Sequence, residues 1–408
     1  MSKFDPNGIR ADFPILDQQN NGVPLVYLDN AATAQTPKQV TEAISDYYGK
    51  VNSNIHRGAH KLAREATIAH EAARLKIAEH LNTLHTHEII FTSGTTDSIN
   101  LISNTLTLSG TINTDDHVII SGLEHHSNIV PWQMLCERTG AKLKVVPVLD
   151  DGTIDMEVFK AMLNERVKVI SISHVSNALG TINPVKEIIQ LARDYDACIL
   201  IDGAQAAPHM RVDVQDLDCD FYVFSGHKTY GPTGIGVLYG KETRLNSLPP
   251  WRGGGEMIKE VTFENTTYND LPFKFEAGTP DIEGAISLAR AIDYMNSIGM
   301  ETIATHENML EQAASSALAE VPGIKFYGTS PHKAAVISFR IDGIHHYDMG
   351  TLMDQMGVAV RTGHLCCQPL MARFGITGTV RASFAAYNTL DDVDRLVAAV
   401  RKATAMLG

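Results

Sequence analysis

The stretch DFYVFSGHKTYGPTGIGVLYG, residues 220–240, contains two apolar runs separated by a polar, glycine-rich turn. Short apolar runs bounded by Gly and Pro are typical of buried strands. Lys228 stands where the first run gives way to the turn. A lysine in that setting is partly desolvated, which lowers the pKa of its amine and frees it to form a Schiff base. Most single lysines are surface charges. This stretch instead predicts a lysine that lies between two buried strands and is chemically unusual.

Apolar runs rich in Val and Ile recur upstream, at residues 88–92, 117–121, 142–148, 167–173 and 198–202. Because most of them are nearly continuous, they indicate a parallel sheet that is covered on both faces. Helical segments lie between most of the runs, for example at 97–108, 128–138 and 184–195. The pattern predicts an α/β fold with a mostly parallel sheet sandwiched by helices.

The alternation of apolar runs and helical segments stops at residues 241–282, where the chain becomes dense in Gly and Pro and is typical of loops. Beyond that point the patterns predict a helical stretch at about 283–320 and further helices near 347–356 and 390–406. Strands are predicted at 334–341, 358–363 and 379–384. We therefore expect an N-terminal segment (1–20), a large domain (21–282) and a smaller α+β C-terminal domain (283–408).

Composition and charge exclude several classes of protein. The 408 residues include 34 Lys and Arg against 47 Asp and Glu, and the net charge of −13 argues against a nucleic-acid or membrane surface. The sequence MSKFDPNGIRADFPILD has no apolar signal-peptide core, and no window approaches the about 18 apolar residues of a transmembrane helix. The five cysteines, an odd number in a long chain, fit a reducing compartment. We expect a cytoplasmic protein.

Polar motifs follow the predicted strands at the edge where ligands collect in such sheets. SGTTDSIN (93–100) suits a phosphate at a helix N-terminus, and equally suits ordinary helix capping. IDGAQ (201–205) ends a buried strand with Asp202, whose carboxylate needs a partner such as a cationic ring nitrogen, a cap or a salt bridge. EHHSN (124–128) offers imidazoles for ring stacking or proton transfer, while a metal site there lacks a third ligand at an obvious spacing.

Two adjacent cysteines, Cys366 and Cys367, lie in the stretch RTGHLCCQP (361–369). They lack the spacing of a zinc site, and a disulfide between neighbours is strained. Basic and polar neighbours favour a thiolate, so a nucleophile is the best physical interpretation. The remaining cysteines fall in helix or strand patterns and are expected to be inert (Cys136, Cys198 and Cys219). Arg381, in TVRASF (379–384), either binds a carboxylate or forms a structural ion pair.

Taken together, SGHKTYGPTGIG, IDGAQ, EHHSN and SHVSNALGT resemble the class V aminotransferase-like enzymes, which use pyridoxal phosphate. RTGHLCCQPLM and VRASFAAYNT narrow the resemblance to the class II cysteine desulfurases of the SUF and CSD type, which are related to selenocysteine lyases. The resemblance extends from YLDNAATAQ (27–35) and HRGAH (56–60) to the last helix. It implies the type I fold of pyridoxal phosphate enzymes and a homodimer with shared active sites.

The resemblance also implies roles for individual residues. Lys228 would hold pyridoxal phosphate covalently, Asp202 would pair with its ring nitrogen, and His125 would stack on the ring and move protons. Gln205 would reach the ring oxygen. The phosphate would be held by Thr95, Thr96, Ser225 and His227, with Thr279 from the partner subunit. The substrate carboxylate would be bound by Arg381, Asn177 and Arg361, and no metal is expected.

The implied reaction converts L-cysteine to L-alanine, with the sulfur held as a persulfide on Cys366. An acceptor protein of the SufE, SufU or CsdE kind would take the sulfur for iron–sulfur cluster assembly. Selenocysteine lyase activity and a non-catalytic sulfur carrier are the alternatives. The sequence departs from the family pattern at Ser93, where an Arg is common, and at Leu365 and Cys367, where the family has His and Ala. Cys367 therefore either fills space, accepts sulfur from Cys366 or forms a disulfide with it.

Overall fold

The computed structural model describes residues 4–408, in which a seven-stranded sheet forms the centre. The strand order is β4-β10-β9-β8-β7-β5-β6. Pairs from β9 to β6 are parallel, whereas β10 is antiparallel to both of its neighbours. The bounds are β4 (Ile89–Thr92), β5 (His117–Ser121), β6 (Lys142–Val146), β7 (Val167–Ser173), β8 (Cys198–Asp202), β9 (Phe221–Ser225) and β10 (Gly236–Gly240). The predicted mostly parallel sheet is confirmed.

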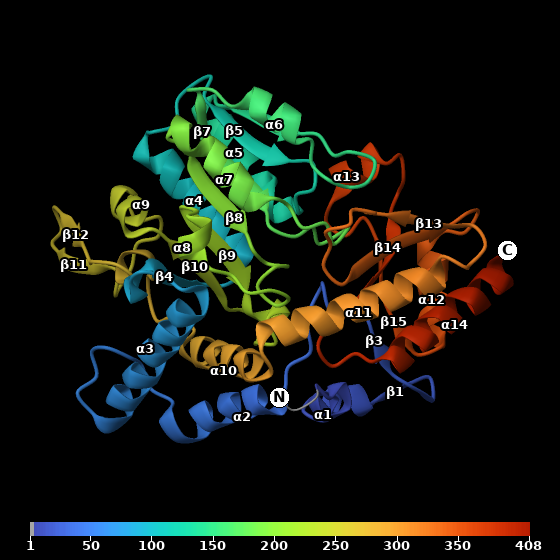
Figure 1. Cartoon of the computed structure of the whole chain (residues 1–408). Coiled ribbons are helices and arrows are strands. Elements are labelled where there is room, and N and C mark those ends of the chain that lie inside the picture. Colours follow the sequence, from blue (N-terminus) through green and yellow to red (C-terminus); the bar gives the residue numbers. More distant parts are fainter. Residues whose placement is uncertain (1–3) are drawn as a thin grey trace.

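Helices cover both faces of this sheet (Figure 1). On one face, α4 (Thr95–Ser109) and α5 (Val130–Thr139) form a core with strand residues such as Val118 and Ile120. On the other face, α3 (Lys61–Leu81), α7 (Val185–Ala192) and α10 (Ile282–Ile298) form a core that includes Ile119. Successive strand side chains point to opposite faces, so continuous apolar strands are what a doubly covered sheet requires.

The C-terminal part is built on a four-stranded antiparallel sheet of order β13-β14-β17-β16. Its strands are β13 (Ile324–Tyr327), β14 (Val336–Ile341), β16 (Arg361–Gly363) and β17 (Thr379–Ser383). The helices α11 (Met300–Leu318), α12 (His346–Gln355) and α14 (Leu390–Leu407) pack with it, and Figure 1 shows α11 and α14 side by side. The predicted run of 358–363 is split, because β15 (Val358–Ala359) pairs in parallel with β3 (Val26–Tyr27) instead.

The single helical stretch predicted at 283–320 is wrong in one respect, because two helices meet there. Gly299 has φ +95°, a conformation that a helix interior does not allow, and it ends α10 before α11 begins. The helix α10 packs against α2 (Lys38–Asp46) and α3, while α11 packs against α14. The domain boundary at residue 282 stays a prediction.

The N-terminal segment contacts both halves: Phe13 is buried in the core of the large sheet, and Arg10 forms an ion pair with Asp392 in α14.

The remaining elements are short. Figure 1 shows the hairpin of β11 and β12 projecting from the body. The other bounds are α1 (Pro6–Arg10), β1 (Gln19–Asn20), β2 (Val23–Pro24), α6 (Met156–Met162), α8 (Val214–Leu217), α9 (Glu242–Ser247), β11 (Ile258–Val261), β12 (Thr266–Tyr268) and α13 (Gln368–Arg373). No helix within residues 4–408 combines the length and apolarity needed to span a membrane.

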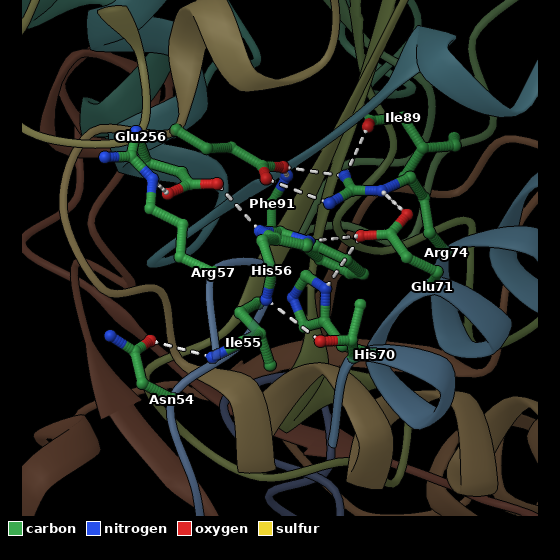
Figure 2. A network of polar contacts seen from close by, with 12 residues as sticks. Asn54, Ile55, His56, Arg57, His70, Glu71, Arg74, Ile89, Phe91 and Glu256 are labelled. Carbon is green, nitrogen blue, oxygen red and sulfur yellow. Dashed lines mark hydrogen bonds and ion pairs between the residues drawn. The ribbon is translucent and has the colours of Figure 1, made fainter. Parts of the chain in front are cut away.

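A buried ion pair connects α3 to the sheet and to the segment that follows the hairpin of β11 and β12. Figure 2 shows its arginine, Arg74, close to Ile89. Arg74 in α3 donates through both terminal nitrogens to Glu276, at 2.7 and 2.9 Å. Glu276 also accepts the backbone N–H of Phe91 at 2.7 Å, and Arg74 donates to the carbonyl of Ile89 at 2.8 Å. The pair thus connects α3, β4 and the chain just before Thr279.

Candidate active site

A cavity of about 270 Å³ opens at the carboxyl ends of the parallel strands. It also receives the loop between β16 and α13, so both halves of the chain contribute to it. Its walls include Thr95, Thr96, His125, Asn177, Asp202, Gln205, Ser225, His227, Lys228, Arg361, Cys366 and Arg381. Thr279 is the one predicted site residue that lies elsewhere, in a separate hollow beside Trp251 and Phe275. The roles of these residues stay predictions.

Lys228 and Asp202 reach the cavity from the ends of neighbouring strands. Lys228 ends a short 3-10 turn directly after β9, and Asp202 is the last residue of β8. Burial lowers the pKa of Lys228, although Asp202 acts in the opposite direction. Burial raises the pKa of Asp202, whose Oδ1 accepts the N–H of Ala204 at 2.9 Å. Within residues 4–408 this is the one hydrogen bond to the carboxylate, and such a buried carboxylate is suited to a cationic partner in the cavity.

Hydroxyl groups collect at the N-terminus of α4. The N-cap of this helix is Gly94, which has no side chain to accept a hydrogen bond from the first turn. Thr95 donates its backbone N–H to the Ser225 hydroxyl at 2.9 Å, and the Thr96 and Ser127 hydroxyls are 2.6 Å apart. A Cβ at Gly236 would lie 2.4 Å from the Cα of Gly94, so glycine lets β10 approach this loop closely. Hydroxyl groups beside the N-terminus of a 15-residue helix suit a phosphate, because the helix dipole favours negative charge there.

His125 lines the cavity as a neutral ring. Burial lowers its pKa to about 3, and the nearby charge of Lys228 acts in the same direction. Its Nδ1 accepts the backbone N–H of Ser127 at 3.1 Å. Because Nδ1 is an acceptor, the proton of the neutral ring resides on Nε2, which can donate it.

The cysteine loop separates its two thiols. Cys366 is exposed and lines the cavity, whereas Cys367 is fully buried. Burial raises the pKa of Cys367 to about 12, so this thiol stays protonated at neutral pH. The backbone of His126 donates to the carbonyl of Cys366 at 2.8 Å, and its Nε2 accepts the N–H of Gln368 at 3.1 Å. His126, the second histidine of EHHSN, therefore holds the loop; the doubled histidine was the only signal for it in the sequence.

Two arginines approach the same part of the cavity. Arg381 is buried in β17, and Arg361 begins β16 with a half-exposed side chain. Both form ion pairs with Asp29, which the sequence analysis did not single out: Nη2 of Arg361 lies 2.7 Å from Oδ2, and Nη2 of Arg381 lies 3.1 Å from Oδ1. Arg381 also donates to the carbonyl of Asn177 at 2.8 Å. Among the described residues its Nε has no hydrogen-bond partner, so Arg381 combines a structural ion pair with a free donor.

A second residue that the sequence analysis missed is Glu124, which is buried and immediately precedes His125 in the chain. Its carboxyl accepts the side-chain amide of Asn128 at 2.7 Å and the backbone N–H of Ser173 at 3.0 Å. Burial raises its pKa to about 7. Glu124 thus connects the loop after β5, which contains His125, to the end of β7. The chain continues from that end of β7 to Asn177.

The family model of the class V aminotransferases (Aminotransferase class-V) matches residues 26–396. The chain belongs to this family. It is 49% identical over 399 residues to a cysteine desulfurase of Synechococcus elongatus, covering 98% of this chain and 64% of that protein. It is 49% identical over 406 residues to a cysteine desulfurase of Salmonella agona, covering 99% of this chain and 100% of that protein. The crystal structure of the cysteine desulfurase CsdA (S-sulfonic acid) from Escherichia coli aligns with a TM-score of 0.92 at 39% identity, covering 100% of both chains.

This class V aminotransferase chain also holds a group of three potential metal ligands outside the cavity, within the part that the structure describes. Ligand atoms of His56, His70 and Glu71 all lie within 4.8 Å of one another (Figure 2). Hydrogen bonds account for the cluster: Glu71 Oε1 lies 3.1 Å from His56 and 3.2 Å from His70, and its Oε2 accepts from Arg74 at 3.2 Å. The guanidinium already beside this carboxylate disfavours a further cation. We interpret the cluster as part of the network that anchors α3.

Proposed function

We propose that the chain is a pyridoxal phosphate-dependent cysteine desulfurase, which converts L-cysteine to L-alanine and holds the released sulfur as a persulfide on Cys366. One observation carries the proposal: Lys228, Arg381 and the exposed thiol of Cys366 line one cavity. An amine that can bind a carbonyl cofactor, a cation that can bind a carboxylate and a thiol that can take up sulfur are the groups this reaction needs.

The residues present fit the cofactor. Lys228 would hold it covalently, and the buried carboxylate of Asp202 would pair with its ring nitrogen. The buried Gln205 donates to the carbonyl of Ala31 at 2.6 Å and has a second N–H for the ring oxygen. The hydroxyls of Thr95, Thr96 and Ser225 at the N-terminus of α4 would hold the phosphate, together with His227 and with Thr279 from the partner subunit. Bound there, pyridoxal phosphate supplies an electron sink for charge that develops on the substrate's α-carbon.

The side chains around the cofactor position can then accept and donate protons. The lowered pKa of Lys228 favours its neutral amine, which can take the α-proton from the substrate. The neutral His125 carries its proton on Nε2, from which it can donate to a departing group. Arg381, assisted by Arg361 and Asn177, would hold the carboxylate so that the substrate sulfur faces Cys366.

Sulfur transfer uses the thiolate of Cys366. Its sulfur attacks the sulfur of L-cysteine, an S–S bond forms, and the bond between Cβ and sulfur breaks. The electron pair of that bond stays with the substrate carbon, which takes up protons and leaves as L-alanine. The exposure of Cys366 leaves its persulfide open to an acceptor.

We also infer the oligomeric state, the sulfur acceptor and the compartment of the protein. We expect a homodimer, and we expect an acceptor protein of the SufE, SufU or CsdE kind that passes the sulfur to iron–sulfur cluster assembly. The loop supports a protein acceptor, since α13 begins at Gln368, two residues after Cys366, and leaves no long arm to carry the sulfur away. All five cysteines are free, which suits a reducing cytoplasm.

The experiment measures L-alanine and sulfide after incubation of the holoenzyme with L-cysteine and a reducing thiol. The expected result is catalytic formation of both from the unmodified protein and loss of sulfur transfer in Cys366→Ala. Reduction with borohydride and peptide mass spectrometry should find the cofactor attached at Lys228. Transfer at full rate by Cys366→Ala would overturn the proposal. Comparing the rates on L-cysteine and L-selenocysteine distinguishes a desulfurase from a selenocysteine lyase. A protein that binds no cofactor but still carries sulfur would be the non-catalytic carrier.

A further inference from the structure

The buried thiol of Cys367 makes a specific contact rather than filling space. Its Sγ donates to Oδ1 of Asn177 at 3.2 Å. Nδ2 of the same amide donates to the carbonyl of Leu365 at 2.8 Å. One side chain in the β7–α7 connection therefore joins the residues on both sides of Cys366.

The chemistry of the two partners fixes the orientation of the Asn177 amide. The carbonyl of Leu365 can only accept, so Nδ2 must face it. Oδ1 then faces Cys367 and needs a donor. The high pKa of Cys367 keeps its proton in place, which makes the thiol that donor. A residue without a polar hydrogen at position 367 would leave the buried Oδ1 unsatisfied.

The loop needs this support because its backbone is strained. Leu365 and Cys366 have φ values of 55° and 56°, so two successive residues with side chains adopt the left-handed conformation. Residues that carry a Cβ adopt this conformation only at a cost in free energy. The carbonyls of both residues are held by hydrogen bonds, from Asn177 and from the backbone of His126 respectively. Cys366 is therefore held in place by contacts on each side of it.

We propose that Cys367 is a positioning residue, which orients the Asn177 amide and thereby holds the strained turn that presents the thiol of Cys366 to the cavity. It is not a second sulfur carrier, because its sulfur is buried and already donates a hydrogen bond. This inference rests on the proposed function only in that Cys366 is the reactive thiol.

The test compares Cys367→Ala with Cys367→Ser in the holoenzyme. Serine keeps a donor but cannot carry sulfur, so the two roles predict different outcomes. Cys219→Ala is the matched control, since Cys219 is also a fully buried thiol but lies just before β9. The measurements are hydrogen–deuterium exchange of the backbone amides of His126, Cys367 and Gln368, and the kcat and KM for L-cysteine.

We expect Cys367→Ala to speed exchange at these amides and lower kcat/KM by roughly fivefold, the equivalent of one hydrogen bond of about 1 kcal/mol. Cys367→Ser should restore most of both, and Cys219→Ala should change neither. Unchanged loop exchange in Cys367→Ala would overturn the inference. Equal loss of turnover in the Ala and Ser variants with unchanged exchange would overturn it in favour of sulfur carriage. Because exchange is measured without turnover, failure of the proposed function would show separately, as absence of alanine from every variant.

Discussion

Arg361 is held against Asp29 by a two-point ion pair, with Nε at 3.2 Å and Nη2 at 2.7 Å from the carboxylate oxygens. Asp29 pairs with Arg381 as well, so one carboxylate serves two guanidinium groups on the cavity wall. The two arginines and Asp29 leave a single positive charge, which matches the single carboxylate of L-cysteine. We therefore expect Asp29 to set the charge in the part of the cavity where the two arginines lie.

Asp29→Asn should relax this charge selection. With two uncompensated guanidinium groups, the cavity should favour dianions, and the inhibition constant of L-aspartate relative to that of L-alanine should fall roughly tenfold, as one nearby charge predicts. The measurement is competitive inhibition of alanine or sulfide formation. Asp150→Asn is the control, since its pair with Arg373 is exposed. An unchanged ratio in Asp29→Asn would show that Asp29 does not set the charge.

Glu276→Gln should destabilise the fold strongly. Arg74 and Glu276 are both almost fully buried, so the variant removes the buried counter-charge of the guanidinium and leaves it beside the more exposed carboxylate of Glu71. The free energy of unfolding should fall by about 3–5 kcal/mol, as measured by denaturant unfolding of the apoprotein. Glu320→Gln breaks the exposed pair with Arg401 and should cost at most about 1 kcal/mol. Similar losses in both variants would contradict the role given to the buried pair.

His174 should make the apoprotein less stable in mild acid. Burial lowers its pKa to about 4 from the ordinary 6.5, so the unfolded chain binds a proton that the folded chain refuses. Stability is therefore complete above about pH 6.5 and is lost as the pH falls toward 4. This residue should contribute about 2 kcal/mol to the loss between about pH 7 and pH 5.

The check on His174 is the pH dependence of the urea midpoint in His174→Gln. The variant should lose less stability in acid than the unmodified protein does, whatever its stability at neutral pH. His332→Gln, at an exposed histidine, is the control. If both variants keep the full acid dependence, burial of His174 is not its source.

The sequence predicted the central strands well because continuous apolar runs such as 167–173 and 198–202 are set by burial on both faces, a local property of the chain. It did not predict that β10 runs antiparallel, since direction follows from the tight return after Lys228 rather than from the run itself. The break at Gly299 was missed because a single glycine within a helical pattern is an ambiguous signal.

The places of Lys228 and Asp202 in the cavity were predictable, because each lies at or just after the carboxyl end of a strand. Asp29 was missed because its role depends on Arg361, 332 residues away in the chain, and that separation leaves no local pattern. The contact between Cys367 and Asn177, 190 residues apart, escaped for the same reason. Motifs thus located the groups, and the fold determined which of them meet.

The central claim is that Cys366 is the residue that receives sulfur. The most direct measurement treats the holoenzyme with L-cysteine in the absence of an acceptor, alkylates it, and locates the added sulfur by tandem mass spectrometry of the peptide that contains both cysteines. We expect one extra sulfur atom on Cys366, none on Cys367, and none on this peptide in Cys366→Ala. Sulfur on Cys367, or sulfur retained on the peptide of the Cys366→Ala variant, would contradict it.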